Sequence, residues 1–221
     1  MIKKLSLSFI KGIGAGAAIA FGGFLYVLLS HYIDGELGKV LGSVAFSIGL
    51  FTVCFFSLHL YTGKIGLVYE NKQEPAFYYS LPIMLIGNAI GAFLIGYICY
   101  FIFKDSEIML TANLVASSRT NLVDFNSYLA LMIKSLLCGL CVYLAVYSYN
   151  HLANKIIGTL LLVFFVFVFV YAGFQHCVAN MFYFGFANHI KGEIFINLTL
   201  CILFNSFGPI FPVLLLKGLS K

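Results

Sequence analysis

The sequence contains no tryptophan and few charged residues. Of its 221 residues, 10% are Asp, Glu, Lys or Arg and 62% are hydrophobic. A soluble domain of this size could not shield so much apolar surface from water, so the composition excludes an ordinary water-soluble fold. Because Trp is absent, any aromatic belt at a membrane surface must be built from the 14 Tyr and 24 Phe residues. We therefore expect an integral membrane protein surrounded by the lipid bilayer.

The sequence also lacks a basic cluster and a disulfide framework. Its formal net charge is +5 and its lysines are scattered among apolar segments, so no nucleic-acid partner is expected. The six cysteines all fall within apolar stretches. Cys138 and Cys141 form a C-x-x-C pair without a second pair of metal ligands, and we interpret them as packing residues. Neither a metal site nor a cofactor is expected.

Long apolar segments dominate the rest of the chain. A helix needs roughly 20 apolar residues to cross the hydrocarbon core, and six segments are candidates. They are residues about 8–30, a second segment from about 40, about 76–103, about 127–149, about 156–187 and about 193–216. The longest polar break between them is 104–126. Lys3 and Lys4 precede the first segment, which is too long for a signal peptide and is interpreted as a retained spanning helix.

The distribution of Lys and Arg predicts the orientation in the membrane. Six spans place both termini on one side. That side would carry Lys3, Lys4, Lys64, Lys72, Lys155, Lys217 and Lys221, with Lys11 at its edge. The other side would carry Lys39, Lys104, Arg119 and Lys191. The bias of about two to one predicts cytoplasmic termini in a multi-pass protein of the cell's inner (plasma) membrane.

Polar residues interrupt two of the predicted spans. The second span runs into the stretch Ser-Leu-His-Leu-Tyr-Thr-Gly-Lys at 57–64, and the fifth contains Gly-Phe-Gln-His-Cys-Val-Ala-Asn at 173–180. Polar groups and non-helical backbone at membrane depth are tolerated only where they line a cavity or pair within the protein. Helices two and five are therefore predicted to be broken at a functional site.

The two halves of the chain share one order of features. Each half has a helix with Lys and Gly five residues apart, then a broken helix, then a helix with Asn-x-x-Gly. The matching residues are Lys11 and Gly16 with Lys134 and Gly139, and Asn88 and Gly91 with Asn205 and Gly208. Since each half has an odd number of spans, the halves must cross in opposite directions, as in inverted-repeat transport proteins. We predict a single transmembrane domain over 1–221, with repeats at about 8–103 and about 127–216.

The sequence resembles the formate/nitrite transporter family over nearly its whole length. The most specific stretch, Gly-Phe-Gln-His-Cys-Val-Ala-Asn-Met at 173–181, is close to the family signature Gly-Phe-Glu-His-x-x-Ala-Asn-Met. Leu-Tyr-Thr at 60–62 stands where the family has its helix-two loop threonine, and 142–146 matches its helix-four segment. The resemblance implies an all-α membrane protein with six transmembrane helices, an aquaporin-like fold, a homopentamer and one pore in each protomer.

The resemblance also implies roles for individual residues. His176 would be the central pore histidine, with Thr62 as its partner on the facing loop. Leu60 and Phe169 would form an apolar constriction. The other implied pathway residues are Phe46, Leu50 and Tyr61 at further narrowing, Lys11 and Lys134 toward opposite vestibules, and Gln175, Asn180 and His59 within the two broken segments.

Three positions depart from the family pattern. Gln175 replaces the usual Glu before the histidine, and Gly139 stands where many members have an Asn near that histidine. His59 occupies a position that is often acidic or small. These departures bear on the substrate preference and on the protonation state of His176.

The implied function is a pore for small monovalent anions of weak acids and for protons. An isolated charge in a low dielectric costs many kcal/mol, and burial raises the pKa of an acid. We therefore expect the anion to gain a proton near the constriction and to pass it as the neutral acid. Formate, nitrite, hydrosulfide, acetate and lactate all fit this class. Gln175 and Cys177 keep a hydrosulfide channel open as an alternative.

Other functions remain as alternatives at this point. A channel for neutral solutes such as water or glycerol would have a similar fold, although the Asn-Pro-Ala pair of aquaporins is absent. An enzyme is not expected, because neither a metal-ligand cluster nor a nucleophile–base motif is visible. A structural or sensor subunit without transport is the third alternative.

Overall fold

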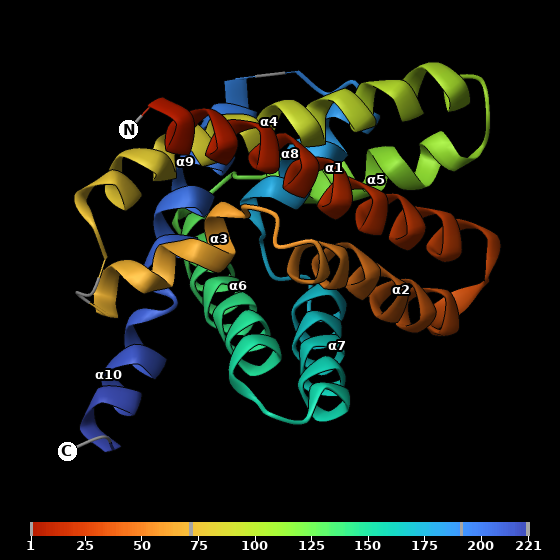
Figure 1. The fold of residues 1–221 in the computed structure, drawn as a ribbon. Helices are drawn as coiled ribbons and strands as arrows, with labels where there is room; N and C mark the ends of the chain where they lie inside the picture. The colour runs from red at the N-terminus through yellow and green to blue at the C-terminus, as the bar shows by residue number, and fades with distance from the viewer. Residues whose placement is uncertain (1, 71–72, 191, 220–221) are drawn as a thin grey trace.

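The computed structural model describes residues 2–70, 73–190 and 192–219, which form an all-helical bundle (Figure 1). Lys72, Lys191 and Lys221, used above to predict orientation, lie outside the described residues. The elements are α1 (Ile2–Tyr32), α2 (Gly35–Phe55), α3 (Tyr61–Lys64), the 3₁₀ segment η1 (Ile65–Glu70), α4 (Pro75–Phe103), α5 (Ile108–Thr120), α6 (Phe125–His151), α7 (Lys155–Tyr171), α8 (Cys177–Phe186), α9 (Gly192–Phe207) and α10 (Ile210–Leu219). The predicted all-α class is confirmed.

Five stretches of the described chain are long and apolar enough to cross a membrane. They are Ile2–Tyr32, Gly35–Phe55, Pro75–Phe103, Phe125–His151 and Gly192–Leu215. The remaining predicted span, at about 156–187, is divided into the shorter apolar helices α7 and α8. Many large apolar side chains of these helices are exposed, such as Phe101, Phe164 and Phe195. A surface of this kind is stable in lipid, so the chain is an integral membrane protein.

The two predicted helix breaks are present. After α2 the chain unwinds, with Ser57 at a φ of 50°, and resumes as α3 at Tyr61. After α7 it unwinds at Gly173, with a φ of 67°, and resumes as α8 at Cys177. The left-handed conformation suits glycine at 173, whereas it costs a residue with a Cβ about 1–2 kcal/mol at Ser57. The surrounding contacts must hold that strained turn in place.

Matching helix crossings occur in the two halves of the chain. α1 packs against α4 at Gly16 and Asn88, and α6 packs against α9 at Gly139 and Asn205. A Cβ on either glycine would overlap the carbonyl oxygen of the asparagine that it faces. Only glycine permits such a close backbone approach. The paired contacts agree with the order of features seen in the sequence.

The helix α5 was not predicted, because its 13 residues lie within the polar break at 104–126. It buries Ile108, Ala112 and Ala116 and packs against α1 and α8.

The following helix α6 begins with a capping box, in which Asp124 and Ser127 bond each other's backbone N–H groups. The sixth predicted span also differs, since it is divided at Gly208 and Pro209 into α9 and α10. Proline favours a helix end here because it cannot donate a backbone hydrogen bond.

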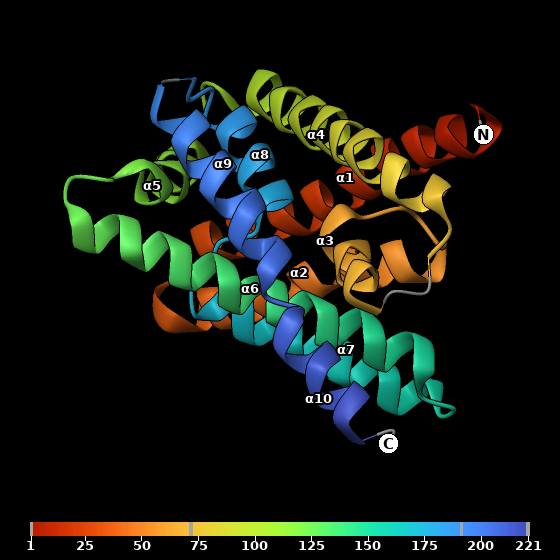
Figure 2. The same cartoon turned by 90° about the vertical axis from the view of Figure 1, so that its left-hand side faces the viewer.

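Both ends of the chain lie on the same side of the bundle. Figure 1 and Figure 2 each show the N- and C-termini on one side and α5 on the other. An even number of crossings produces this arrangement when the two broken helices, α2–α3 and α7–α8, each count as one. The two breaks face each other in the middle of the bundle, where α3 and α8 begin.

Candidate functional site

His176 is held at the centre of the bundle by two hydrogen bonds. It is the residue preceding α8, and its Nδ1 accepts the backbone N–H of Ala179 at 3.1 Å. Because a backbone amide can only donate, Nδ1 is the unprotonated ring nitrogen and Nε2 carries the hydrogen. Nε2 then donates to Oγ1 of Thr62 at 2.8 Å. Both side chains are buried, so the predicted pair does come together, with a neutral imidazole.

Apolar side chains surround this pair. The Phe169 ring stacks beside His176 with 5.9 Å between ring centroids, and Phe46 meets Phe169 edge-on at 5.7 Å. Leu60, the residue before α3, is 1% exposed. The pair and these apolar groups form a block that we call the central barrier: Leu60, Thr62, Phe169 and His176.

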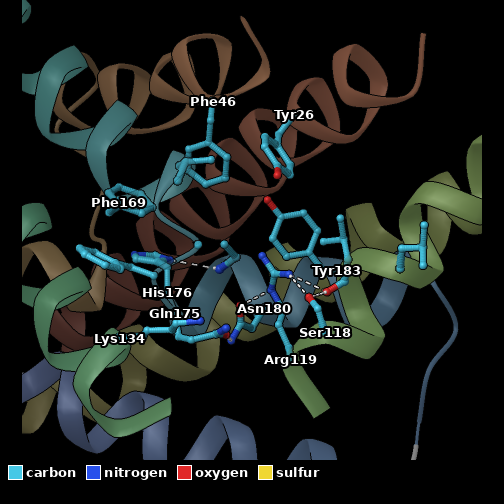
Figure 3. A pocket seen from close by; sticks show the side chains of 16 residues that line it. Tyr26, Phe46, Ser118, Arg119, Lys134, Phe169, Gln175, His176, Asn180 and Tyr183 are labelled. Carbon is cyan, nitrogen blue, oxygen red and sulfur yellow. Dashed lines mark hydrogen bonds between the residues drawn. The ribbon is translucent and has the colours of Figure 1, made fainter. Parts of the chain in front are cut away.

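A cavity of about 300 Å³ opens on one side of the central barrier (Figure 3). Phe46, Phe169 and His176 line its inner part, and we call it the Arg119 cavity. Its polar lining residues are Tyr26, Ser118, Arg119, Lys134, Gln175, His176, Asn180 and Tyr183. No Asp or Glu among the described residues lines it. The cavity therefore presents an excess of positive charge.

A second cavity, of about 90 Å³, lies on the other side and is called the Lys64 cavity. Its lining residues are Val53, Cys54, Ser57, Leu58, Leu60, Gly63, Lys64, Val146 and Asn150. No residue lines both cavities. Leu60 borders one cavity and His176 the other, so the central barrier separates two spaces that each contain a lysine.

Arg119, in the last turn of α5, contacts other residues in the wall of the Arg119 cavity. Its Nε donates to Oδ1 of Asn180 at 2.9 Å, and its guanidinium lies 4.3 Å from the centroid of the Tyr183 ring. The Asn180 amide in turn donates to Gln175 at 2.8 Å and to Asn197 at 3.0 Å. A continuous hydrogen-bonded network therefore runs along one wall of the cavity.

Five predicted pathway residues line neither of these two cavities: Thr62, which lies in the central barrier, and four others. The Lys11 ammonium donates to the Ser57 carbonyl at 3.1 Å. His59 bonds Ser8 at 3.2 Å and lines a separate surface cavity near the start of α4. Tyr61 bonds Ser206 through its hydroxyl at 2.9 Å, and Leu50 is a fully buried core residue.

Gly139 is one of the three positions that depart from the family pattern. Gly139 lies at the α6–α9 crossing and lines neither cavity. Its missing Cβ makes room for the backbone of Asn205, so an asparagine at this position would collide with α9.

Sequence reasoning missed several polar residues that line the cavities, among them Arg119, Lys64 and Asn150. Arg119 and Lys64 were counted only as charges that set the orientation. Lys64 is the last residue of α3, and Arg119 lies in the last turn of α5, whose packing on α8 only the folded structure reveals.

No group of three or more His, Cys, Asp or Glu residues within the described chain could hold a metal ion. The six cysteines are free thiols, and five of them are buried. Cys138 and Cys141 lie within α6, as expected of packing residues.

The chain matches known proteins over nearly its whole length. Residues 2–219 match the family model for formate/nitrite transporters. The formate channel FocA of Haemophilus influenzae is 26% identical over 194 residues, covering 81% of this chain and 66% of that protein. A probable formate transporter of Methanothermobacter thermautotrophicus is 29% identical over 213 residues, covering 82% of this chain and 73% of that protein. The chain thus spans about two thirds of the length of the Haemophilus protein.

Two solved structures share the fold. One is a pentameric formate channel with formate bound, with a TM-score of 0.78 and 21% identity over 99% of this chain and 96% of that chain. The other is an ion channel of the FNT family, with a TM-score of 0.80 and 21% identity over 99% of this chain and 91% of that chain. At this level of identity the likeness shows the fold alone.

Proposed function

Because the chain belongs to the formate/nitrite transporter family, we propose that it is a transmembrane channel or transporter for small monovalent anions of weak acids. The observation that carries the proposal is a pair of cavities, each lined by a lysine, separated by a buried barrier. Lys134 lines one cavity and Lys64 the other. Neither lysine has an acidic partner within the described chain.

The two cavities attract anions, whereas the barrier rejects them. Cationic groups in a cleft with low-dielectric walls raise the local concentration of anions. The central barrier offers Leu60 and Phe169 on its apolar part and only the Thr62–His176 pair as polar groups. Desolvation of a bare anion at the central barrier would cost many kcal/mol. The proposed solution is that the substrate gains a proton and crosses as the neutral acid.

Thr62 supplies the polar contact for the crossing molecule. Its hydroxyl oxygen accepts the Nε2–H of His176, and this is the one hydrogen bond described for the side chain. The hydroxyl hydrogen is therefore available to a passing oxygen or sulfur atom. Nδ1 of His176 accepts a backbone N–H at the N-terminus of α8. The neutral imidazole therefore donates its Nε2–H to Thr62 and orients the threonine hydroxyl.

Assembly and orientation complete the proposal. The fold neighbour that is described as pentameric, together with the exposed apolar faces, supports a homopentamer. The predicted lysine bias supports cytoplasmic termini in the inner (plasma) membrane. The paired crossings at Gly16 and Gly139 support one domain over 1–221 made of two inverted repeats, at about 8–103 and about 127–216.

Reconstituted flux tests the function. Proteoliposomes would be loaded with formate, nitrite or hydrosulfide, and efflux would be followed at two pH values, with His176→Phe as the matched variant. We expect flux of at least one anion above that of protein-free liposomes, and a strong loss in the variant because both hydrogen bonds of His176 disappear. Swelling in glycerol without any anion flux would instead identify a neutral-solute channel.

A further inference from the structure

Ser206, in α9, accepts hydrogen bonds from two tyrosines of the first half of the chain. Its own hydroxyl donates to the Ile202 carbonyl at 2.7 Å. A serine hydroxyl has one hydrogen, so in the 2.9 Å contact between Tyr61 and Ser206 the tyrosine hydroxyl is the donor. The hydroxyl of Tyr69 donates to the backbone carbonyl of Ser206 at 3.0 Å. One residue of α9 is therefore bonded to both α3 and η1.

α9 bonds the residues next to both members of the central Thr62–His176 pair. Tyr61 precedes Thr62, and Cys177 follows His176. The backbone N–H of Cys177 donates to Oδ1 of Asn205 at 3.0 Å, and the following residue of α9 is the one that bonds Tyr61. Two consecutive residues of one helix thus hold both sides of the 2.8 Å hydrogen bond between Thr62 and His176.

The bond at Ser206 has no counterpart in the other half of the chain. Asn88 corresponds to Asn205, but the residue after Asn88 is Ala89, which has no hydroxyl. The crossing of α1 and α4 therefore forms without such a bond. Removing the Tyr61 hydroxyl would also leave the Ser206 hydroxyl bonded to its own helix, so the cost to folding is expected to be small. The repeated fold does not explain this contact.

We propose that Tyr61 and Ser206 are positioning residues for transport. The bond between their hydroxyls holds α3 where the Thr62 hydroxyl can accept the Nε2–H of His176. This inference rests on the proposed function and adds to it the groups that keep the polar contact of the central barrier in place. Neither Tyr61 nor Ser206 lines either cavity, so both act through Thr62.

A hold from the second half of the chain is what the central pair needs. The Asn88 side chain already accepts the backbone N–H of Tyr61, but Asn88 belongs to the first half, as Thr62 does. His176 belongs to the second half, and so does Ser206. Hydrogen bonds weaken steeply when their angle departs from the favoured range. A small rotation of α3 away from α9 would therefore weaken the contact between Thr62 and His176.

Tyr61→Phe tests the role because it removes only one hydroxyl. Uptake into proteoliposomes would be measured with formate, nitrite or hydrosulfide, whichever the parent passes fastest. We expect the maximal rate to fall roughly 2- to 10-fold, the factor that corresponds to one ordinary hydrogen bond, with KM unchanged because both cavities keep their charges. Ser206→Ala should match Tyr61→Phe, and Ser206→Thr, which keeps the hydroxyl, should retain the parental rate. Tyr79→Phe is the control, since Tyr79 is exposed and lines neither cavity.

A double variant separates positioning from a general structural role. If Tyr61 acts through Thr62, Tyr61→Phe should cause no further loss of rate once Thr62 is replaced by Val, because the positioned hydroxyl is already absent. Residues that act independently give additive free energies, so their losses of rate multiply. Losses that multiply in the Tyr61→Phe, Thr62→Val protein would overturn the proposal, as would a parental rate in Tyr61→Phe alone.

Nuclear magnetic resonance checks the same contact without transport. In ¹⁵N-labelled protein in bilayers, the Nε2–H signal of His176 would be assigned by its loss in His176→Phe. We expect this signal to move in Tyr61→Phe toward its position in Thr62→Val. An unchanged signal would overturn the positioning role and leave the proposed function standing. A parent that passes none of the three anions would overturn the proposed function itself, and with it any role of Tyr61 in transport.

Discussion

Asn88 and Asn205 make the same three hydrogen bonds in the two halves of the protein. The Asn88 side chain accepts the N–H of Tyr61, the first residue of α3, and donates to the carbonyls of Gly12 and His59. The Asn205 side chain accepts the N–H of Cys177, the first residue of α8, and donates to the carbonyls of Ser135 and Gln175. Each asparagine thus fastens a broken helix to the two intact helices beside it.

Replacing either asparagine by aspartate should destabilise the fold to a similar extent. Aspartate would still accept the backbone N–H, but its second oxygen would face two carbonyl oxygens in a buried site. The loss should be on the order of 3–5 kcal/mol, as when a buried polar network is broken. Melting of Asn88→Asp and Asn205→Asp in detergent would measure it.

The control for this pair is Asn113→Asp, because Asn113 is exposed on α5. Its melting temperature should stay close to that of the parent. If Asn205→Asp also melted like the parent, the bridging role of the asparagines would be wrong.

Gly16→Ala and Gly139→Ala should both reduce the yield of folded protein. The added Cβ would overlap the carbonyl oxygen of the facing asparagine, and backbone cannot move aside as a flexible side chain can. Overpacking of this kind typically costs about 1–3 kcal/mol, or more where no relief is possible. Gly218→Ala is the matched control, since nothing lies within 4 Å of its added Cβ. Thermal melting and size-exclusion chromatography would rank the three variants, and equal behaviour would contradict the prediction.

The sequence allowed the breaks and the central pair to be predicted, because polar residues inside apolar spans are rare and costly. His176 and Thr62 belong to such stretches, and the structure places them 2.8 Å apart. The family resemblance supplied the pairing, since the two residues lie 114 positions apart in the chain and no local pattern connects them.

Charged residues outside the motifs could not be assigned from the sequence. Lys11 matches Lys134 in the linear repeat, yet the Lys11 ammonium bonds the Ser57 carbonyl while Lys64 lines the cavity. Which lysine faces a cavity depends on the strained turn at Ser57, whose φ of 50° has no signature in its residue type. The position of Arg119 could not be predicted either, because it lies in α5, a helix too short to span the membrane.

Thr62→Val should lower anion flux while preserving the fold. Valine keeps the shape of threonine, but the Nε2–H of His176 would lose its acceptor and the crossing molecule would lose its donor. A lost hydrogen bond of about 1–3 kcal/mol corresponds to a flux lower by roughly 5- to 150-fold. Thr62→Ser restores the hydroxyl and should recover most of the flux. Stopped-flow measurement of formate uptake would compare them, and equal flux in Thr62→Val and the parent would remove the hydroxyl from the mechanism.

Flux should increase as the external pH falls at constant total substrate. The neutral acid is the protonated form, so its fraction rises as pH approaches the substrate pKa, by about tenfold for each pH unit above that pKa. The sign is therefore opposite to that of a channel conducting the bare anion, whose flux would stay level or fall. Uptake of radiolabelled formate over a range of roughly pH 5 to 8, where formate is mostly ionised, would distinguish them. Flat uptake over that range would rule out passage as the acid.

Lys64→Gln should lower flux more strongly than Lys155→Gln at low ionic strength. Lys64 lines the cavity beside Leu60, and its ammonium has no acidic partner in the described chain. Lys155 carries the same charge on the same predicted side, but it donates to the carbonyl of Tyr149 and lines neither cavity.

The size and salt dependence of the effect identify its cause. Removing a charge that concentrates anions should lower flux by roughly 3- to 10-fold at low salt. The difference between the two variants should shrink near 1 M salt, where the screening length is about 3 Å. If instead Lys64→Gln lost flux equally at low and high salt, the lysine would act through the local structure of α3, and its melting temperature would fall as well. If Lys64→Gln matched Lys155→Gln at every salt concentration, the Lys64 cavity would not lie on the anion pathway.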